Sequence, residues 1–215
     1  MRSIILTSLA ATTMWFAQPS GLAWAHPHVW VTMKNELLFA PDGSVTGVRH
    51  AWTFDDMFSA FATQGLEQKT KGAFTRDELA PLAKVNIESL KEFAYFTFAK
   101  MNGQTAKFNG PTDYWLDYKD SVLTLHFTLP FTAPAKPKVL DVDVYDPTYF
   151  VDFAFAKKDP VALAGAPVSC KFTAQKPNDL SAGQSQQFGE AFFNKLDTMS
   201  NWGAQFANRL VVTCP

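Results

Sequence analysis

The sequence predicts a mainly β protein of the α+β class: an antiparallel, sandwich-like β domain with an inserted helix–loop–helix and a C-terminal helix. Short segments of alternating apolar and polar residues, separated by turn residues, recur along most of the chain. The spacing of apolar residues changes to a helical period at about residues 55–94 and again after residue 187. No stretch after residue 25 approaches the length of a membrane-spanning helix.

The first 25 residues predict a signal peptide that is removed on export. Arg2 supplies a short positive start, an apolar run extends to Ala17, and Ala23-Trp24-Ala25 has the small residues of a signal-peptidase site. The apolar run is interrupted by Thr and Ser and is too short to span a membrane comfortably, so cleavage is favoured over an uncleaved anchor. We therefore expect residues 26–215 to form a single β-rich domain that contains the helical insertion.

The composition limits the classes of partner. The 215 residues include 19 Lys and Arg against 20 Asp and Glu, and this near balance gives no reason to expect nucleic acid or an anionic membrane surface as a partner. The 20 Phe residues predict a core rich in large rings. Trp30 and Trp52 are expected in that core.

Two strands joined by a tight turn are predicted to open the domain. Alternation favours strands over residues 29–39 and 45–54, and the Asp-Gly pair in Pro41-Asp42-Gly43-Ser44 favours a hairpin between them. One face of the second strand carries Val48, His50, Trp52 and Phe54. In the first strand, His28 and Trp30 lie on the face opposite Val29.

The helical insertion has a clear start signal for its second helix. Thr75 and Glu78 have the spacing of a capping box, in which the threonine caps the helix and the glutamate bonds back to the cap. The loop at residues 67–78 has the 12-residue frame of an EF-hand. Lys69 and Lys71 stand where carboxylates bind calcium, and a charged lysine offers the ion no lone pair. We interpret this segment as a degenerate EF-hand-like loop that does not bind calcium.

The pattern returns to strands after residue 95. Strands are expected at 114–118, 122–129, 139–144, 150–155, 168–174 and 210–214, with a proline-rich link at 131–138. In the strand at 122–129, His126 points away from the core face. The C-terminal helix is predicted from the apolar stripe of Phe188, Phe192, Leu196 and Met199.

The chain has two cysteines, Cys170 and Cys214. An even count in an exported protein favours one disulfide, which closes a loop of about 45 residues and ties the C-terminus to the fold. The alternative is a pair of sulfur ligands for a metal.

Signal-peptide cleavage leaves His26 at the mature N-terminus, with an α-amine and an imidazole on one residue. These two nitrogens, together with another histidine, form the set called a histidine brace. Pro27 has no N–H and therefore excludes the common N-terminal copper site that uses deprotonated backbone amides. In extended backbone, His26 and His28 lie on the same face, so their imidazoles can converge on one ion.

His50 and His126 are the remaining histidines. His50 lies on the strand predicted to pair with the strand of His28, and either residue could join a site built on His26 and His28. A site of three or four nitrogens suits nickel, cobalt, zinc or copper. The alternative for His50 and His126 is a structural role within the sheets.

Four motifs resemble the domain-of-unknown-function 1007 family. They are His26-Pro27-His28-Val29-Trp30, the segment 49–55, Leu125-His126-Phe127, and the segment 144–150 with the sequence VYDPTYF. The resemblance spans nearly the whole mature chain. It implies a bacterial periplasmic protein and a membrane metal transporter of the nickel/cobalt type as its partner.

The leading expectation is a periplasmic metal-binding accessory protein of a transition-metal transport system. Two alternatives stay open: a copper histidine-brace redox enzyme, and a metal-free periplasmic interaction module that docks through its Phe-rich helical insertion. The sequence has no Ser-His-Asp or Cys-His set that predicts a catalytic centre, so a binding role is favoured over an enzyme.

Overall fold

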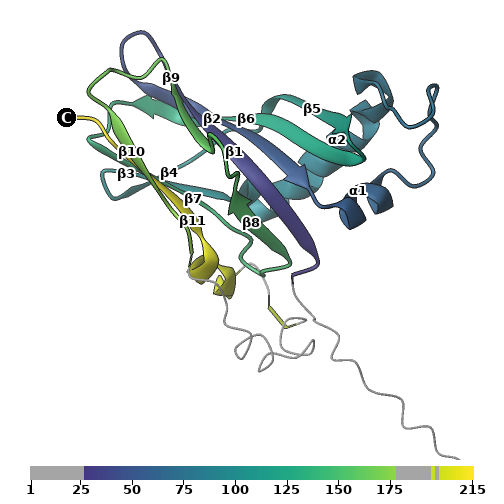
Figure 1. The fold of residues 1–215 in the computed structure, drawn as a ribbon. Helices are drawn as coiled ribbons and strands as arrows, with labels where there is room; N and C mark the ends of the chain where they lie inside the picture. The colour runs from purple at the N-terminus through teal and green to yellow at the C-terminus, as the bar shows by residue number, and fades with distance from the viewer. Residues whose placement is uncertain (1–26, 178–194, 197–198) are drawn as a thin grey trace, which may run out of the picture.

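The computed structural model describes residues 27–177, 195–196 and 199–215, which form two β-sheets with helices beside one end of the first sheet (Figure 1). The strands of the first sheet run in the order β5-β6-β2-β1-β8, with β9 also paired to β1, and those of the second in the order β10-β11-β7-β3-β4. The predicted mainly β, sandwich-like α+β fold is therefore confirmed.

The first sheet is built around the predicted hairpin. Its strands are β1 (Val29–Phe39), β2 (Val45–Phe54), β5 (Thr112–Lys119), β6 (Val122–Ala135), β8 (Val151–Phe155) and β9 (Val161–Ala164). The pairs β1–β2, β2–β6 and β5–β6 are antiparallel. The far edge of β1 is shared by two short parallel strands, β8 near its start and β9 near its end.

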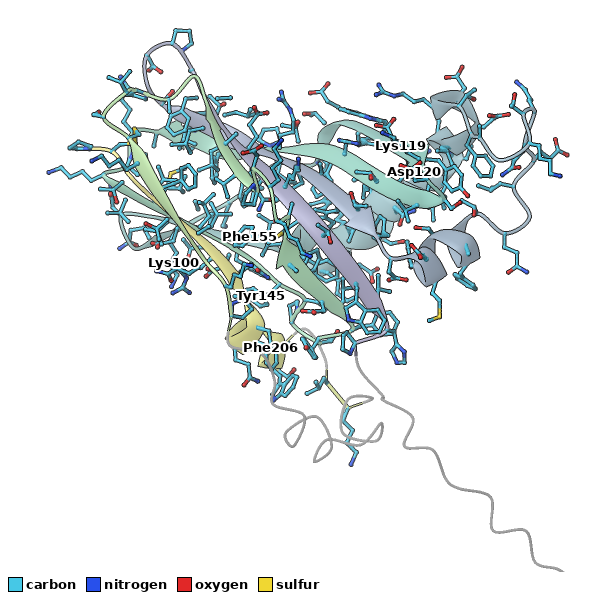
Figure 2. The ribbon with its side chains drawn as sticks, in the orientation of Figure 1. Lys100, Lys119, Asp120, Tyr145, Phe155 and Phe206 are labelled. Atoms are coloured by element: carbon cyan, nitrogen blue, oxygen red, sulfur yellow. A yellow bond between two sulfur atoms is a disulfide. The ribbon has the colours of Figure 1, made fainter. Side chains whose placement is uncertain are left out.

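The second sheet contains β3 (Thr97–Met101), β4 (Gln104–Ala106), β7 (Val139–Val144), β10 (Lys171–Gln175) and β11 (Asn208–Thr213). All its neighbouring strands are antiparallel. Figure 2 shows Phe155 between the two sheets and Lys100 on the far side of the second sheet. Lys100 is exposed on this outer face.

The core is built from the inward-facing residues of both sheets. Trp52 is 1% exposed, and its ring centroid lies 4.8 Å from those of Phe127 and Phe153. The expectation for Trp30 was wrong: this side chain is 45% exposed. Trp30 alternates with the buried Val29 and Val31, so the pleat of β1 directs it outward.

The helix–loop–helix insertion is also confirmed. It comprises α1 (Asp56–Ala62) and α2 (Arg76–Leu90), and a 3₁₀ segment η1 (Lys91–Phe96) leads into β3. The capping box forms as predicted, with Glu78 N bonded to Thr75 Oγ1 and Thr75 N bonded to the Glu78 carboxylate. The buried side of α2 packs with the core.

The proline-rich link at 131–138 was predicted wrongly at its start, because β6 continues to Ala135. Pro130 has no N–H, yet it pairs opposite Gly47 beside a register shift in β2. A Cβ on Gly47 would lie 2.6 Å from the Leu129 carbonyl oxygen, so only glycine permits this approach. The next segment is held by a bond from Thr132 N to Lys107 O.

The C-terminal part is fixed by the predicted disulfide. Cys170 and Cys214 are bonded, which ties the start of β10 to the end of β11. Most of the predicted C-terminal helix lies outside the described residues, and the chain re-enters the second sheet through a 3₁₀ segment, η2 (Trp202–Phe206). Among the residues described, no helix has the length and apolar character needed to cross a bilayer.

Candidate functional site

His28 lies at the start of β1 and is exposed. Its backbone N–H donates to the Phe150 carbonyl oxygen at 2.9 Å, and its imidazole centroid lies 4.9 Å from that of the Phe150 ring. These contacts fix the point at which the chain enters the domain. The imidazole is therefore presented at one end of the first sheet, two residues from the predicted cleavage point.

The position of Phe150 is set by a buried carboxylate in the VYDPTYF motif. Asp146 is 3% exposed, and its Oδ1 accepts from both the backbone N–H and the hydroxyl of Thr148, each at 2.8 Å. Its Oδ2 accepts from Val151 N at 3.0 Å. Asp146 thereby organises the turn between β7 and β8. The motif has a structural role: it holds Phe150 against His28.

An exposed apolar surface adjoins His28. We call it the N-terminal apolar surface; its members are His28, Val29, Met57, Phe58, Phe61 and Phe150. Met57 and Phe61 on α1 are 73% and 75% exposed, and Phe150 is 45% exposed. Asp55 sets the direction of α1, because its carboxylate accepts from Phe58 N and from Trp30 N, each at 2.8 Å.

His50 is placed in the core. It is 0% exposed, and its ring stacks on Phe127 with centroids 4.8 Å apart. With the proton on Nδ1, the ring donates to Asn35 Oδ1 at 2.8 Å, and Nε2 lies 3.3 Å from Thr97 Oγ1. Burial lowers the pKa of His50 to about 3, because the core solvates the imidazolium poorly. The folded protein therefore holds this ring neutral.

His50 and His28 lie far apart along the sheet. His50 pairs with Asn35, seven residues from His28, which corresponds to roughly 20 Å along β1 at the rise of a strand. The two side chains also point to opposite faces, since β1 exposes the face of Trp30 and buries the face that meets His50. The pairing of the two strands, which the sequence predicted, does not bring these imidazoles together.

His126 lies on the outer face of the first sheet in a cluster with three other side chains. Its Nε2 is 3.1 Å from Asp117 Oδ2, and its ring stacks on Trp115 with centroids 4.6 Å apart. The Arg76 guanidinium lies 4.6 Å from the Trp115 ring centroid, and its Nε donates to Asp117 Oδ1 at 3.3 Å. The pKa of His126 is lowered from its ordinary value. Partial burial is the largest cause, and the Arg76 cation lowers the pKa as well, while the Asp117 carboxylate opposes the shift.

Of the four predicted ligands, the structure describes three and brings none of them together. Within residues 27–177, 195–196 and 199–215, no group of three His, Cys, Asp or Glu side chains is close enough to hold a metal ion. His26 lies outside the described residues. The predicted site that combines His26 with His28 therefore stays a prediction, while His50 and His126 occupy separate places in the fold.

The Arg76–Trp115–His126–Asp117 cluster was not predicted from the sequence. The signal that could have found it is the alternation in β5, which puts Trp115 and Asp117 on one face. Once β5 and β6 are paired, Trp115 falls opposite His126. The contribution of Arg76 depends on how α2 docks, and that docking leaves no local pattern in the sequence.

The EF-hand-like loop between α1 and α2 is held by its own hydrogen bonds. The Glu78 carboxylate accepts from Thr75 N at 2.7 Å and from Lys69 N at 3.0 Å, and Gln68 Oε1 accepts from Gly72 N at 3.1 Å. The hydrogen bonds from Thr75 and Lys69 hold the pKa of Glu78 below its ordinary value. The carboxylate at the twelfth position of the frame is thus engaged in capping α2.

Comparison with known proteins identifies the family. Residues 11–214 match the family described as "Protein of unknown function (DUF1007)". The chain belongs to this family. The match includes His28, His50 and His126, the VYDPTYF loop and both cysteines.

Two similar proteins have names that state no activity. An "Uncharacterized protein" of Haemophilus influenzae is 24% identical over 195 residues, covering 88% of this chain and 91% of its own. An "Uncharacterized 15.5 kDa protein in trpE 3'region" of Spirochaeta aurantia is 33% identical over 93 residues, which are 43% of this chain and 66% of its own.

Among solved structures, a Biomphalaria glabrata acetylcholine-binding protein aligns at 10% identity with a TM-score of 0.37, covering 96% of this chain and 90% of its own. A likeness at that level carries no inference about binding.

Proposed function

We propose that this is an exported, periplasmic accessory protein that captures a divalent transition metal and delivers it to, or receives it from, a membrane metal transporter. The metal is a cargo of the nickel, cobalt, zinc or copper class. The observation that carries the proposal is the exposed imidazole of His28 at the start of β1, next to the predicted mature N-terminus. The proposed ligands of the metal are the α-amine and imidazole of His26 and the imidazole of His28.

The donor set follows from where the other histidines lie. His50 is buried with both ring nitrogens beside polar partners, so its ring has a structural role without a metal. His126 is held by Asp117 and Trp115 on another part of the sheet. Three nitrogens from two histidines that are separated by one residue form a set that suits nickel, cobalt, zinc or copper and leaves room for a ligand from the transporter. Such an incomplete site fits a protein that exchanges its metal.

Export is supported by two features of the chain. The first 25 residues have the order of a signal peptide, with a positive start, an apolar run and a small-residue cleavage site. The bonded pair Cys170–Cys214 suits an oxidising compartment such as the periplasm, where disulfides persist.

The test is a calorimetric titration of the mature protein, beginning at His26, with Ni²⁺, Co²⁺, Zn²⁺ and Cu²⁺. We expect one metal per chain with micromolar or tighter affinity, and at least a roughly ten-fold loss in His26→Ala and in His28→Ala, since each removes one of three donors. His126→Ala is the matched control and retains the affinity. Unchanged affinity in His26→Ala would contradict the proposal.

A chain with one added glycine before His26 separates the amine from the imidazoles. The addition moves the α-amine away from His26 while leaving both histidine side chains in place. With Zn²⁺ or Co²⁺, a site that uses the amine weakens in this variant, whereas a site made of imidazoles alone keeps its affinity.

A second candidate function is a metal-free interaction module, and the N-terminal apolar surface favours it. The exposed Met57 and Phe61 on α1 form an apolar area of the kind that marks protein contacts. The partner under this proposal is an apolar segment of a membrane protein. Sedimentation of the mature protein with bacterial inner-membrane vesicles tests it: Phe61→Asp abolishes retention, and so does protease treatment of the vesicles. Retention by protease-treated vesicles would contradict a protein partner.

A further inference from the structure

A cavity lies on the outer face of the second sheet, apart from the histidines. It has a volume of about 610 Å³, within the range of small-molecule sites. Its floor is formed by the outward-facing residues of β3 and β7, and its sides by β4, η1 and η2. Figure 2 shows Lys100 on this side of the molecule. The proposed metal site uses none of these residues.

One wall of the cavity is a fixed aromatic pair. The Phe98 and Tyr145 rings are stacked, with centroids 4.5 Å apart and an angle of 26° between their planes. The Tyr145 hydroxyl donates to Asn201 Oδ1 at 2.9 Å, and Tyr145 is 8% exposed. The stack and the hydrogen bond hold this wall in place, so the partly exposed Phe98 ring presents an apolar surface to a ligand at little entropic cost.

The charges around the cavity are unevenly paired. Arg209 is neutralised by a bidentate ion pair with Asp143, at 2.7 and 2.9 Å. Lys100 stands opposite Asp141 in the β3–β7 register, but the two do not form an ion pair, and Lys107 has no ion-pair partner among the residues that the structure describes. Two lysine ammonium groups against one carboxylate thus leave the cavity with an excess of positive charge.

A strained turn forms the edge of the cavity. Ala94, Tyr95 and Phe96 have φ values of 51°, 54° and 49°, a left-handed conformation that is unfavourable for residues other than glycine. The turn puts Ala94 and Tyr95 at the cavity while burying Phe96 in the core. Thr97 stabilises it by donating from Oγ1 to Tyr95 O at 2.8 Å. Backbone strain of this kind is concentrated at functional sites in proteins.

We propose that this cavity binds a small aromatic carboxylate. The ring of the ligand lies against the Phe98–Tyr145 wall, and its carboxylate accepts hydrogen bonds from the Lys100 and Lys107 ammonium groups. Such a ligand matches both the flat apolar surface and the unpaired positive charge, whereas a cationic ligand meets two lysines. The proposal is independent of the metal site and can fail without affecting it.

The experiment is a titration of the ¹⁵N-labelled mature protein with indole-3-acetate, followed by backbone amide NMR. Saturable shifts are expected at Phe98, Lys100, Thr105 and Arg209. The matched uncharged probe, indole-3-acetamide, is expected to bind at least about ten-fold more weakly, because it lacks the charge that the lysines recognise. Shifts that do not saturate, or equal binding of acid and amide, would overturn the proposal.

Two lysine variants place the carboxylate. Lys100→Gln weakens the binding of indole-3-acetate by about ten-fold, because it removes one charge-assisted hydrogen bond. Lys119→Gln, a control on β5 at the far end of the other sheet, leaves it unchanged. Both lysines are exposed, so neither change is expected to disturb folding. Equal affinity in the two variants would contradict the proposed role of Lys100.

Discussion

The imidazole of His126 lies flat against the indole of Trp115, with ring centroids 4.6 Å apart and planes within 6° of parallel. Trp115 Nε1 donates to Asp117 Oδ2 at 3.3 Å, and the same oxygen lies 3.1 Å from His126 Nε2. The Arg76 guanidinium lies over the Trp115 ring, 4.6 Å from its centroid. One carboxylate thereby connects β5, β6 and the start of α2.

The cluster predicts opposite shifts in the pKa of His126 for two substitutions. Asp117→Asn removes the negative charge that favours the imidazolium, so the pKa falls further; Arg76→Gln removes a repelling cation, so it rises. Titration of the His126 ring protons by NMR measures both. Shifts of the same sign in the two variants would show that these charges do not control His126.

His50 predicts a loss of stability in mild acid. The unfolded chain protonates this residue near its ordinary pKa of 6.5, whereas the folded chain holds it neutral down to about pH 3. The unfolded state therefore binds more protons below pH 6.5, and stability falls as the pH falls through this range, by about 2 kcal/mol between pH 7 and pH 5.

His50→Gln removes the titrating group and retains a polar side chain beside Asn35. Urea unfolding at pH 7 and pH 5 should show that this variant, although less stable at pH 7, has lost that pH dependence. The same pH dependence in both proteins would assign it to other groups, such as His126, instead.

Local patterns were enough to predict the hairpin and the insertion. The bounds of β1 and β2 agree with the predicted 29–39 and 45–54, because alternation and an Asp-Gly turn are encoded within one short stretch. The capping box at Thr75 likewise depends only on neighbours in the chain. The continuation of β6 past Pro130 could not be predicted, since it depends on Gly47 in a distant segment.

The candidate site was less predictable because convergence of side chains is a property of tertiary structure. Alternation correctly placed His50 on the same face as Trp52 and His126 away from the core face of its own strand. It gave no measure of how far His50 lies from His28 along β1. The cavity beside Phe98 was missed for a related reason: its residues come from β3, β4, β7, η1 and η2, and only the assembled second sheet brings them together.

We expect the disulfide between Cys170 and Cys214 to contribute strongly to the free energy of unfolding. Replacing Cys170 and Cys214 by serine opens a loop with a sequence separation of 44 residues. The chain-entropy model gives a loss of about 4 kcal/mol for a loop of this length. Urea unfolding of the double variant measures it, with the wild type under reducing conditions as the comparison.

The same double variant should lose protection in β10. This edge strand is exposed throughout, and the disulfide ties it to β11. Hydrogen exchange is expected to rise in β10 before it rises in β7. Unchanged exchange in β10 would show that its hydrogen bonds alone hold it in place.

The close approach of β6 to Gly47 leaves no room for a larger residue at this position. In Gly47→Ala the new Cβ meets the Leu129 carbonyl oxygen at 2.6 Å, so the β2–β6 pair must shift. We expect a loss of roughly 1–3 kcal/mol in urea unfolding. Gly110→Ala is the control, because no atom lies within 4 Å of the added Cβ. Equal stability of the two variants would contradict this role for Gly47.

The central proposal depends on a mature protein that begins at His26 and carries a metal there. The most direct measurement is elemental analysis of protein purified from the periplasm of cells that express the full 215-residue chain, together with sequencing of its N-terminus. We predict an N-terminal His-Pro-His sequence and close to one transition-metal ion per chain. A different N-terminus, or a correctly processed protein that neither carries nor takes up nickel, cobalt, zinc or copper, would contradict the proposal.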